Sequence, residues 1–246
     1  MDEYALRLGD DCLVLAQRLC EWSSRGPELE EDVALTNIAL DLLGQARALL
    51  TYAGALEGRG RDEDALAYGR DTREFLNCQL VELPNGDFAQ TMARQLLFSA
   101  FQVEQWNALR DSADTTLAAV AARAAKEAAY HREHAELWVL RLGDGTEESR
   151  RRMQAGLDAT WPYTAELFES DALVRGLVAA GVAVDPACLR PQWSAVVTGV
   201  VGRATLRIPE SRWAPDGGRR GLHTEAFGLL LAEMQHLHRA HPGARW

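Results

Sequence analysis

Cysteine is scarce in this sequence, which has four cysteines scattered over 246 residues and no Cys-x-x-Cys pair. Two of them, Cys12 and Cys20, lie at helical spacing in an apolar stripe, where a thiol packs as a small hydrophobic group. This distribution argues against a disulfide scaffold and a zinc finger. We expect the cysteines to be structural.

Basic charge is also low, and lysine is almost absent. Lys126 is the single lysine, and 36 Asp and Glu residues outnumber 26 Lys and Arg residues, which gives a formal charge of −10 and a pI near 5.1. Binding to a phosphate backbone requires a clustered excess of Lys and Arg. We therefore expect no nucleic-acid partner.

A long apolar run and an export signal are missing as well. The uncharged apolar stretches fall well short of a bilayer span, so neither a transmembrane helix nor a membrane partner is expected. The chain opens Met1-Asp2-Glu3-Tyr4, without the basic and apolar regions of an export signal. We expect a cytoplasmic protein.

The sequence does contain apolar residues that recur with the period of an α-helix. Apolar residues recur at intervals of three and four with almost no strand signals, which predicts an all-α chain. Four long helices are expected, over about residues 4–22, about 28–56, 88–106 with Asp87 as the N-cap, and about 115–142. Further helices are expected over 147–169 and 222–239, joined by a stretch richer in Pro and Gly.

Long amphipathic helices of this kind predict a four-helix bundle. We expect a single domain over residues 1–246. Its core bundle would comprise about residues 4–142, and a helical extension of about residues 146–240 would pack on that bundle.

Each of the four long predicted helices carries one polar residue inside its apolar stripe: Asp11, Asp41, Ser99 and His131. A buried carboxylate is costly unless it is paired, hydrogen-bonded or bound to a metal. Bundles of this kind build di-iron sites from a Glu on each of two helices and a Glu-x-x-His on each of the other two. A di-iron site and a buried polar cluster are therefore the two explanations to compare.

The partner ligands of a di-iron site are absent. Three residues after Asp41 is Gly44, and three residues before His131 is Ala128, and neither can bind a metal. Glu127 is adjacent, but one residue turns a side chain by about 100° around a helix. We therefore expect no metal, catalytic or cofactor-binding residues, and we predict a buried polar cluster instead.

No other motif supplies a self-sufficient chemistry. The single intact Glu-x-x-His runs from Glu233 to His236, and without a second copy we interpret it as a chance match. A nucleophile elbow, a phosphate-binding loop and a dinucleotide-binding motif are all missing.

Five segments are distinctive in their order and spacing: LRLGDDCLVL at 6–15, DLLGQAR at 41–47, PNGDF at 84–88, KEAAYH at 126–131 and GLHTE at 221–225. Together they resemble the PaaC-type subunit of bacterial phenylacetyl-CoA epoxidase. The likeness extends over essentially the whole chain.

This resemblance implies a ferritin-like fold and a place in the multicomponent ring 1,2-epoxidase of aerobic phenylacetate breakdown. The catalytic partner would be a related ferritin-like subunit of the PaaA type that holds the di-iron centre. Other subunits of the complex include a reductase that carries electrons through FAD and a [2Fe-2S] cluster.

The resemblance also implies a noncatalytic, structural role for this chain, with no cofactor of its own. The ligand positions of the catalytic type fall here on Asp11, Asp41, Gly44, Ser99, Ala128 and His131. Three of these six cannot bind iron in the manner of the family, and the two remaining carboxylates are shortened to Asp.

Two alternatives stay open. The first is a di-iron oxygenase in its own right, with an unusual site of Asp11, Asp41, Glu127 and His131. The second is an unrelated helical scaffold or regulator. Self-association of the isolated chain as a homodimer is a further expectation, because a subunit with a partner-sized apolar surface is prone to it.

Overall fold

The computed structural model describes residues 1–244, and these form helices and connecting segments with no β-strand. This confirms the all-α prediction. The four long helices are α1 (Asp2–Cys20), α2 (Leu29–Glu57), α5 (Phe88–Leu109) and α6 (Thr115–Gly143). The shorter helices are α3 (Glu63–Tyr68), α4 (Gln79–Glu82), α7 (Glu147–Thr160), α8 (Ala172–Ala179), α9 (Arg190–Arg203) and α10 (Glu225–Ala240), with 3-10 turns η1 (Thr72–Glu74), η2 (Trp161–Phe168), η3 (Pro186–Leu189) and η4 (Gly218–Arg220).

The chain divides into two compact units. The first comprises residues 1–84 together with the segment from 216 onward, and the second comprises residues 85–215. These boundaries differ from the predicted core bundle and extension, because α10 packs on α1, α3 and α4 of the N-terminal segment. A single domain over the whole chain stays a prediction.

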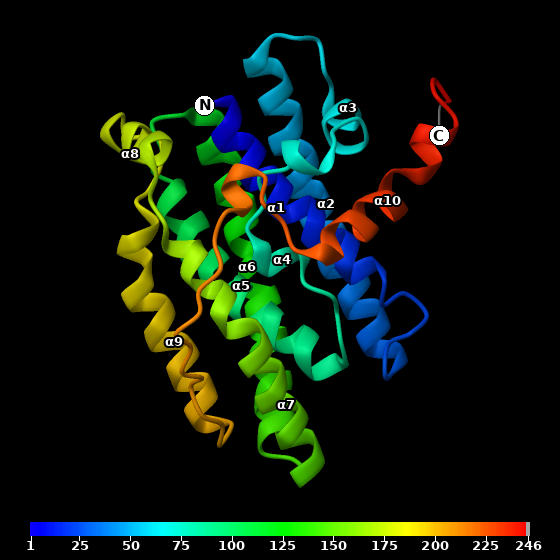
Figure 1. Ribbon diagram of the computed structural model, residues 1–246. Helices are drawn as coiled ribbons and strands as arrows, with labels where there is room; N and C mark the ends of the chain where they lie inside the picture. Colours follow the sequence, from blue (N-terminus) through cyan, green and yellow to red (C-terminus); the bar gives the residue numbers. More distant parts are fainter. Residues whose placement is uncertain (245–246) are drawn as a thin grey trace. The chain divides into compact units, whose positions relative to one another are not determined.

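The first unit is built on the antiparallel pair of α1 and α2 (Figure 1). The short connection between these helices makes them antiparallel neighbours. Buried leucines lie on the sides where these two helices face each other: Leu8, Leu15 and Leu19 of α1, and Leu35, Leu42 and Leu49 of α2. The last helix of the chain, α10, therefore completes a unit that begins with the first.

The second unit is built on the antiparallel pair of α5 and α6, against which α7 and α9 pack. Aromatic side chains join its parts. The indole Nε1 of Trp193 on α9 donates to the carbonyl of Leu97 at 2.9 Å, and the Trp193 ring meets Phe168 at 5.0 Å between centroids. Phe168 in turn lies edge-on to Phe101 of α5. The 3-10 turn η2 is thus held between α5 and α9.

Aspartates cap several of these helices. The carboxylate of Asp87 accepts from the N–H of Gln90 at 2.9 Å, which confirms the predicted N-cap of α5. Asp114 caps α6 in the same way through the N–H of Leu117. These oxygens satisfy N–H groups that have no partner within the helix.

The stretch between the two predicted C-terminal helices is more regular than expected, since it contains α8 and α9. The predicted helix of 147–169 is also divided, because α7 ends at Thr160 and η2 begins at Trp161. Pro162 lies at the start of η2, where its missing N–H removes a helical hydrogen bond.

One helix within residues 1–244, α2, is long and apolar enough to cross a membrane by length and composition. The expectation that the chain has no transmembrane helix stays a prediction; α2 meets the criterion because between residues 33 and 50 only Asp41 and Arg47 are charged. The criterion is weak, since a core helix of a soluble protein also passes it. Here the apolar side of α2 packs on α1.

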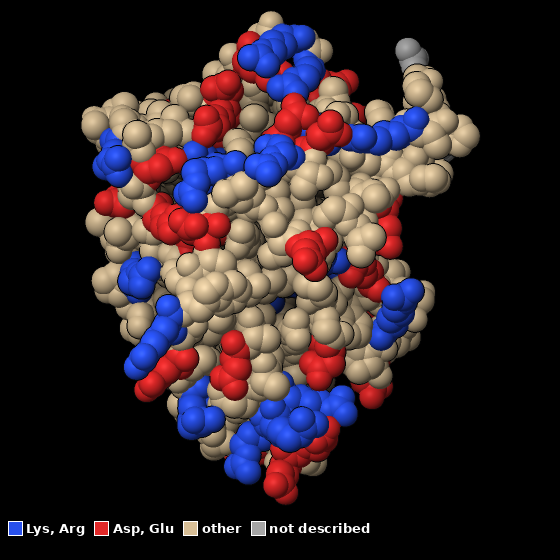
Figure 2. Space-filling view, in the orientation of Figure 1, with Lys and Arg blue, Asp and Glu red and all other residues tan. Residues whose placement is uncertain are grey.

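Charged side chains of both signs are intermixed on the face shown in Figure 2. At the start of α7, for example, Arg151 and Arg152 both pair with Glu148, at 2.8 and 2.7 Å. Hydrogen bonds from these arginines lower the pKa of Glu148 to about 2. Because exposed pairs contribute little to stability, the cohesion of the units comes from their interiors.

Phe227 tests the attachment of α10 to the first unit. Its fully buried ring lies 4.2 Å from the His223 ring and edge-on to Phe75 at 5.5 Å. We expect Phe227→Ala to lower the free energy of unfolding by about 3–5 kcal/mol, through loss of burial and a residual cavity. Urea unfolding measures this. The control is Leu229→Ala on the exposed side of α10, with an expected change within about 0.5 kcal/mol; equal effects would contradict the packing.

Candidate functional site

Two consecutive carboxylates on α1, Asp10 and Asp11, lie at the centre of the first unit. Both are buried. Adjacent residues point about 100° apart around a helix, so the two carboxylates meet different neighbours. Each is held by an arginine from a distant part of the chain.

Asp10 is paired with Arg70, which follows α3. One guanidinium nitrogen of Arg70 lies 2.9 Å from Asp10 Oδ2, and the other contacts Oδ1. Asp10 also accepts from the N–H of Leu76 at 2.9 Å. The Arg70 guanidinium lies 4.1 Å from the centre of the Phe75 ring. Asp10 thus fixes the irregular segment between α3 and α4 against α1.

Asp11 is paired with Arg219, which comes from the C-terminal segment. The two terminal nitrogens of Arg219 donate to the two oxygens of Asp11 at 3.0 and 2.7 Å, a bidentate geometry. The N–H of Cys78 adds a third bond at 2.8 Å. Two residues after Arg219, Gly221 lets the segment lie against the backbone of Arg73, because a Cβ at its left-handed position would lie 2.2 Å from the carbonyl oxygen of Arg73.

A third carboxylate, Glu82 of α4, is also fully buried. It lies 2.7 Å from Nδ1 of His223 and accepts from the side-chain amide of Asn77 at 2.8 Å. The N–H of Thr224 donates to its other oxygen. The Arg18 guanidinium donates to the backbone carbonyl of Glu82. Glu82 therefore anchors the start of α10.

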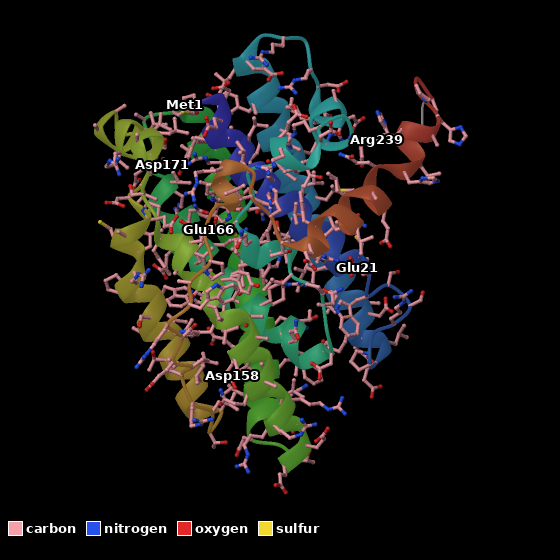
Figure 3. All side chains as sticks on the ribbon, in the orientation of Figure 1. Met1, Glu21, Asp158, Glu166, Asp171 and Arg239 are labelled. Atoms are coloured by element: carbon pink, nitrogen blue, oxygen red, sulfur yellow. The ribbon has the colours of Figure 1, made fainter. Side chains whose placement is uncertain are left out.

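Arg239, labelled in Figure 3, continues this attachment along α10. Its guanidinium donates to the carbonyl of Arg70 and to the carboxylate of Asp71, both at 3.0 Å. The amide of Gln235 donates to the carbonyls of Ala67 and Arg70. The C-terminal segment is thus bonded to residues 67–82 along its length.

Burial is the largest influence on the pKa values of two groups in this unit, Asp11 and Tyr4. It raises the pKa of Asp11 above its ordinary value, while the Arg219 guanidinium and the Cys78 N–H act in the opposite direction. Burial also raises the pKa of Tyr4, to about 12, with Arg219 and Arg7 opposing. Tyr4 therefore stays neutral in the folded protein well above the range where an exposed tyrosine ionises.

The six predicted ligand positions are divided between the two units. Asp11, Asp41 and Gly44 belong to the first, and Ser99, Ala128 and His131 belong to the second. Asp41 and Gly44 are half-buried, whereas the other four are buried. A joint polar cluster of Asp11, Asp41 and His131 stays a prediction; the bonds that hold Asp11 come from Arg219 and Cys78.

The donors at these positions do not fit a pair of iron ions. Gly44 and Ala128 offer no side-chain donor, and the Ser99 hydroxyl donates to the carbonyl of Gln95 one turn earlier. The carboxylate of Asp11 is already held by a guanidinium, whose positive charge opposes a cation. No group of three or more His, Cys, Asp or Glu side chains within residues 1–244 is placed to hold a metal ion.

Of the other candidate ligands, Glu127 belongs to the second unit, and Glu233 and His236 belong to the first. Glu127 accepts from Arg123 Nε at 2.7 Å, one turn earlier on α6. Glu233 and His236, the intact Glu-x-x-His, are both exposed on α10.

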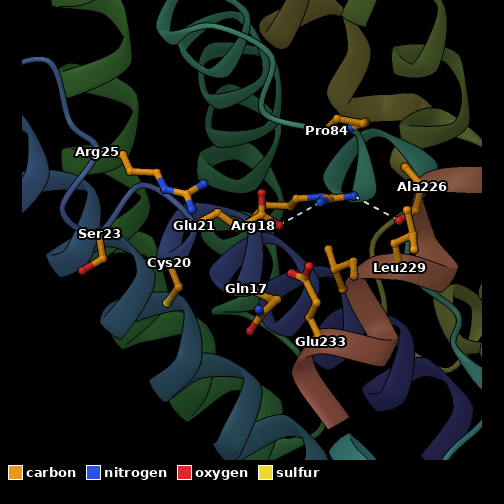
Figure 4. A pocket seen from close by; sticks show the side chains of 11 residues that line it. Gln17, Arg18, Cys20, Glu21, Ser23, Arg25, Pro84, Ala226, Leu229 and Glu233 are labelled. Atoms are coloured by element: carbon orange, nitrogen blue, oxygen red, sulfur yellow. Dashed lines mark hydrogen bonds and ion pairs between the residues drawn. The ribbon is translucent and has the colours of Figure 1, made fainter. Parts of the chain in front are cut away.

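Glu233 lines a surface groove of about 590 Å³ between α10 and the C-terminal end of α1 (Figure 4). The groove also contains Cys20, whose thiol pKa is raised by burial and by Glu21. A raised pKa keeps the thiol protonated and therefore a poor nucleophile. Arg18, on the same wall, is held by bonds to Glu82 and Glu21. The groove thus lacks an activated nucleophile.

Comparison with known proteins agrees with the resemblance found in the sequence. The model of a family described as phenylacetic acid catabolic protein matches residues 1–246. The chain belongs to this family. A curated relative from Escherichia coli (strain K12), the C subunit of 1,2-phenylacetyl-CoA epoxidase, is 51% identical over 243 residues, which cover 99% of this chain and 98% of the relative. The resemblance to the PaaC-type subunit is thereby confirmed.

Inspection of the sequence missed the partners of the buried carboxylates. Arg70, Arg219 and His223 lie in irregular segments, where no periodicity marks a residue as buried. The sequence signal near them is GLHTE at 221–225, a distinctive segment with a glycine beside polar residues.

Arg219 is expected to be essential for stability. Arg219→Ala would leave Asp11 buried without its counter-charge, at a cost of about 3–5 kcal/mol near pH 7. In the variant, burial raises the pKa of Asp11 without opposition from Arg219, so Asp11 is neutral at a pH near 3.8, the ordinary pKa of an aspartate. The loss in free energy of unfolding relative to wild type should therefore shrink as the pH falls from 7 toward 4. Urea unfolding between pH 4 and pH 7 measures both effects.

The neighbouring arginine supplies the control. Arg220 pairs with Asp216 at the surface, where both side chains are more than half exposed. We expect Arg220→Ala to change the stability by less than about 0.5 kcal/mol. If Arg219→Ala and Arg220→Ala lose the same free energy of unfolding, the Asp11–Arg219 pair contributes no more to stability than a surface pair.

Tyr4 should make the protein sensitive to alkali. Between pH 10 and pH 12 the unfolded chain releases the Tyr4 proton while the folded protein retains it, so stability falls as the pH rises. The two-unit difference corresponds to about 2–3 kcal/mol. Tyr4→Phe should remove this part of the alkaline loss in urea titrations at pH 9 to 12. Tyr130→Phe, at an exposed tyrosine, is the control; an unchanged alkaline slope in Tyr4→Phe would contradict the prediction.

Proposed function

We propose that this chain is the PaaC-type subunit of a 1,2-phenylacetyl-CoA epoxidase and that its role is structural rather than catalytic. The relative from that enzyme aligns with nearly the whole chain. The observation that carries the structural role is the Asp11–Arg219 pair, together with the absence of donors at Gly44 and Ala128. A carboxylate neutralised by a guanidinium is not available to a metal.

In this proposal the catalytic chemistry belongs to a related ferritin-like subunit of the PaaA type. That subunit would hold the di-iron centre, and a reductase with FAD and a [2Fe-2S] cluster would supply electrons. The ferritin-like four-helix bundle is part of the proposal, because short connections join α1 to α2 and α5 to α6 while a single long crossover joins α2 to α5, as in such a fold. So is a cytoplasmic location.

The alternative, a di-iron oxygenase built on Asp11, Asp41, Glu127 and His131, has less support. Two of its four ligands already have charged partners: Asp11 is bonded to Arg219 within the first unit, and Glu127 pairs with the exposed Arg123 one turn earlier on α6. Moving Asp11 onto a metal would leave Arg219 partly buried without its carboxylate.

Iron content distinguishes the two proposals. After aerobic iron loading and desalting, we expect this chain to retain far less than one iron per chain by elemental analysis. The related ferritin-like subunit, treated identically, is the positive control. A reproducible two irons per chain would contradict the structural role and favour the oxygenase.

Reconstitution tests the function itself. With phenylacetyl-CoA, the reductase and an iron-loaded catalytic subunit, we expect oxygenation to require this chain. Arg220→Ala should support turnover at the wild-type rate, because it alters only a surface pair. If the catalytic subunit and reductase reach the full rate without this chain, the assignment fails.

A further inference from the structure

The outer side of α2 is an apolar stripe. Four of the large apolar side chains that are exposed in the described chain lie on it within fifteen residues: Leu29, Val33, Leu40 and Leu43. Their spacing of four, seven and three residues places them within about 80° of one another around the helix. The buried leucines of α2 lie on the opposite side, against α1.

This spacing indicates the kind of partner. Apolar residues spaced by three, four and seven residues lie along the seam of a helix–helix contact, in which side chains of one helix fit between those of the other. A flat or irregular partner would not match a single straight row. The stripe therefore fits an amphipathic α-helix.

A groove of about 300 Å³ adjoins the stripe. It lies between α2 and α3 and shares Leu43 with the stripe. Its apolar wall consists of Leu13, Leu43, Ala46, Leu50, Ala67 and Tyr68. A concave apolar site beside a helical seam is suited to one large side chain of a docking helix, the usual form of an interface anchor.

The charge around the stripe favours a basic partner. Residues 28–46 include five acidic residues and no Lys or Arg. Glu63 and Asp64 add two carboxylates to the groove, and the cation that lines it, Arg47, donates to Glu63 at 3.1 Å. A second copy of this chain would bring the same acidic surface and be repelled, whereas a helix flanked by Lys and Arg would be attracted.

We propose that the apolar stripe of α2 and its groove are the docking surface for an amphipathic helix of the catalytic partner, with basic residues flanking the apolar side of that helix. This rests on the proposed function, which supplies the partner. The proposed contact lies on α2, which belongs to the first unit of this chain.

A matched pair of double variants tests the location. Leu29 and Leu40 are 77% and 59% exposed, and on α10 Leu229 and Leu237 are 73% and 60% exposed. We expect Leu29→Lys with Leu40→Lys to weaken binding to the immobilised ferritin-like subunit at least tenfold. The same substitutions at Leu229 and Leu237 should change the dissociation constant less than twofold.

A second measurement tests the charge. Glu28→Gln with Glu30→Gln should slow association at low ionic strength, and the difference from wild type should disappear at 0.5 M salt (about a 4–5 Å screening length). Thermal unfolding checks that the α2 variants fold. If the double lysine variant melts early, Leu40→Gln alone takes its place, with Leu237→Gln as its control.

The possible outcomes separate this proposal from the one on which it rests. If the wild-type chain does not bind the ferritin-like subunit, the proposed function fails. If the wild type binds and the α2 variant binds equally well, or if the α10 variant loses as much, the docking surface alone is overturned. Loss of a homodimer without loss of the complex would also overturn it, by making α2 a contact between copies.

Discussion

The first unit depends on the pairing of buried carboxylates with arginines from distant segments. Asp10 binds Arg70 and Asp11 binds Arg219, so one turn of α1 fixes both the segment after α3 and the segment before α10. Neither carboxylate can be left without its partner, because an uncompensated buried charge is strongly destabilising. The irregular parts of the unit are thereby ordered without regular secondary structure.

The same pairing limits what this unit can do chemically. The resemblance to the catalytic type implies a metal-ligand position at Asp11, yet the two oxygens of Asp11 are satisfied by Arg219 and a backbone N–H. A guanidinium supplies positive charge where iron would supply it in a metal site. The guanidinium disfavours a cation beside Asp11, which supports the proposed structural role.

Association with another subunit requires apolar side chains that are exposed rather than packed in the interior of the unit. The long helix α2 has two apolar sides: one packs on α1, and the other carries the exposed stripe with Leu40. This double character also explains why α2 has the hydropathy of a membrane span. A helix that contacts a neighbour on each side needs apolar residues around most of its circumference.

The sequence by itself determined the helical class, the places of the four long helices and the Asp87 cap, because periodicity and capping are local properties of the chain. It also determined that Gly44 and Ala128 cannot serve as ligands, since that follows from their side chains alone. The partners of the buried carboxylates were decided only by tertiary structure. Arg219 is 208 residues from Asp11, and its pairing depends on α10 folding back onto the N-terminal unit rather than on any pattern near either residue.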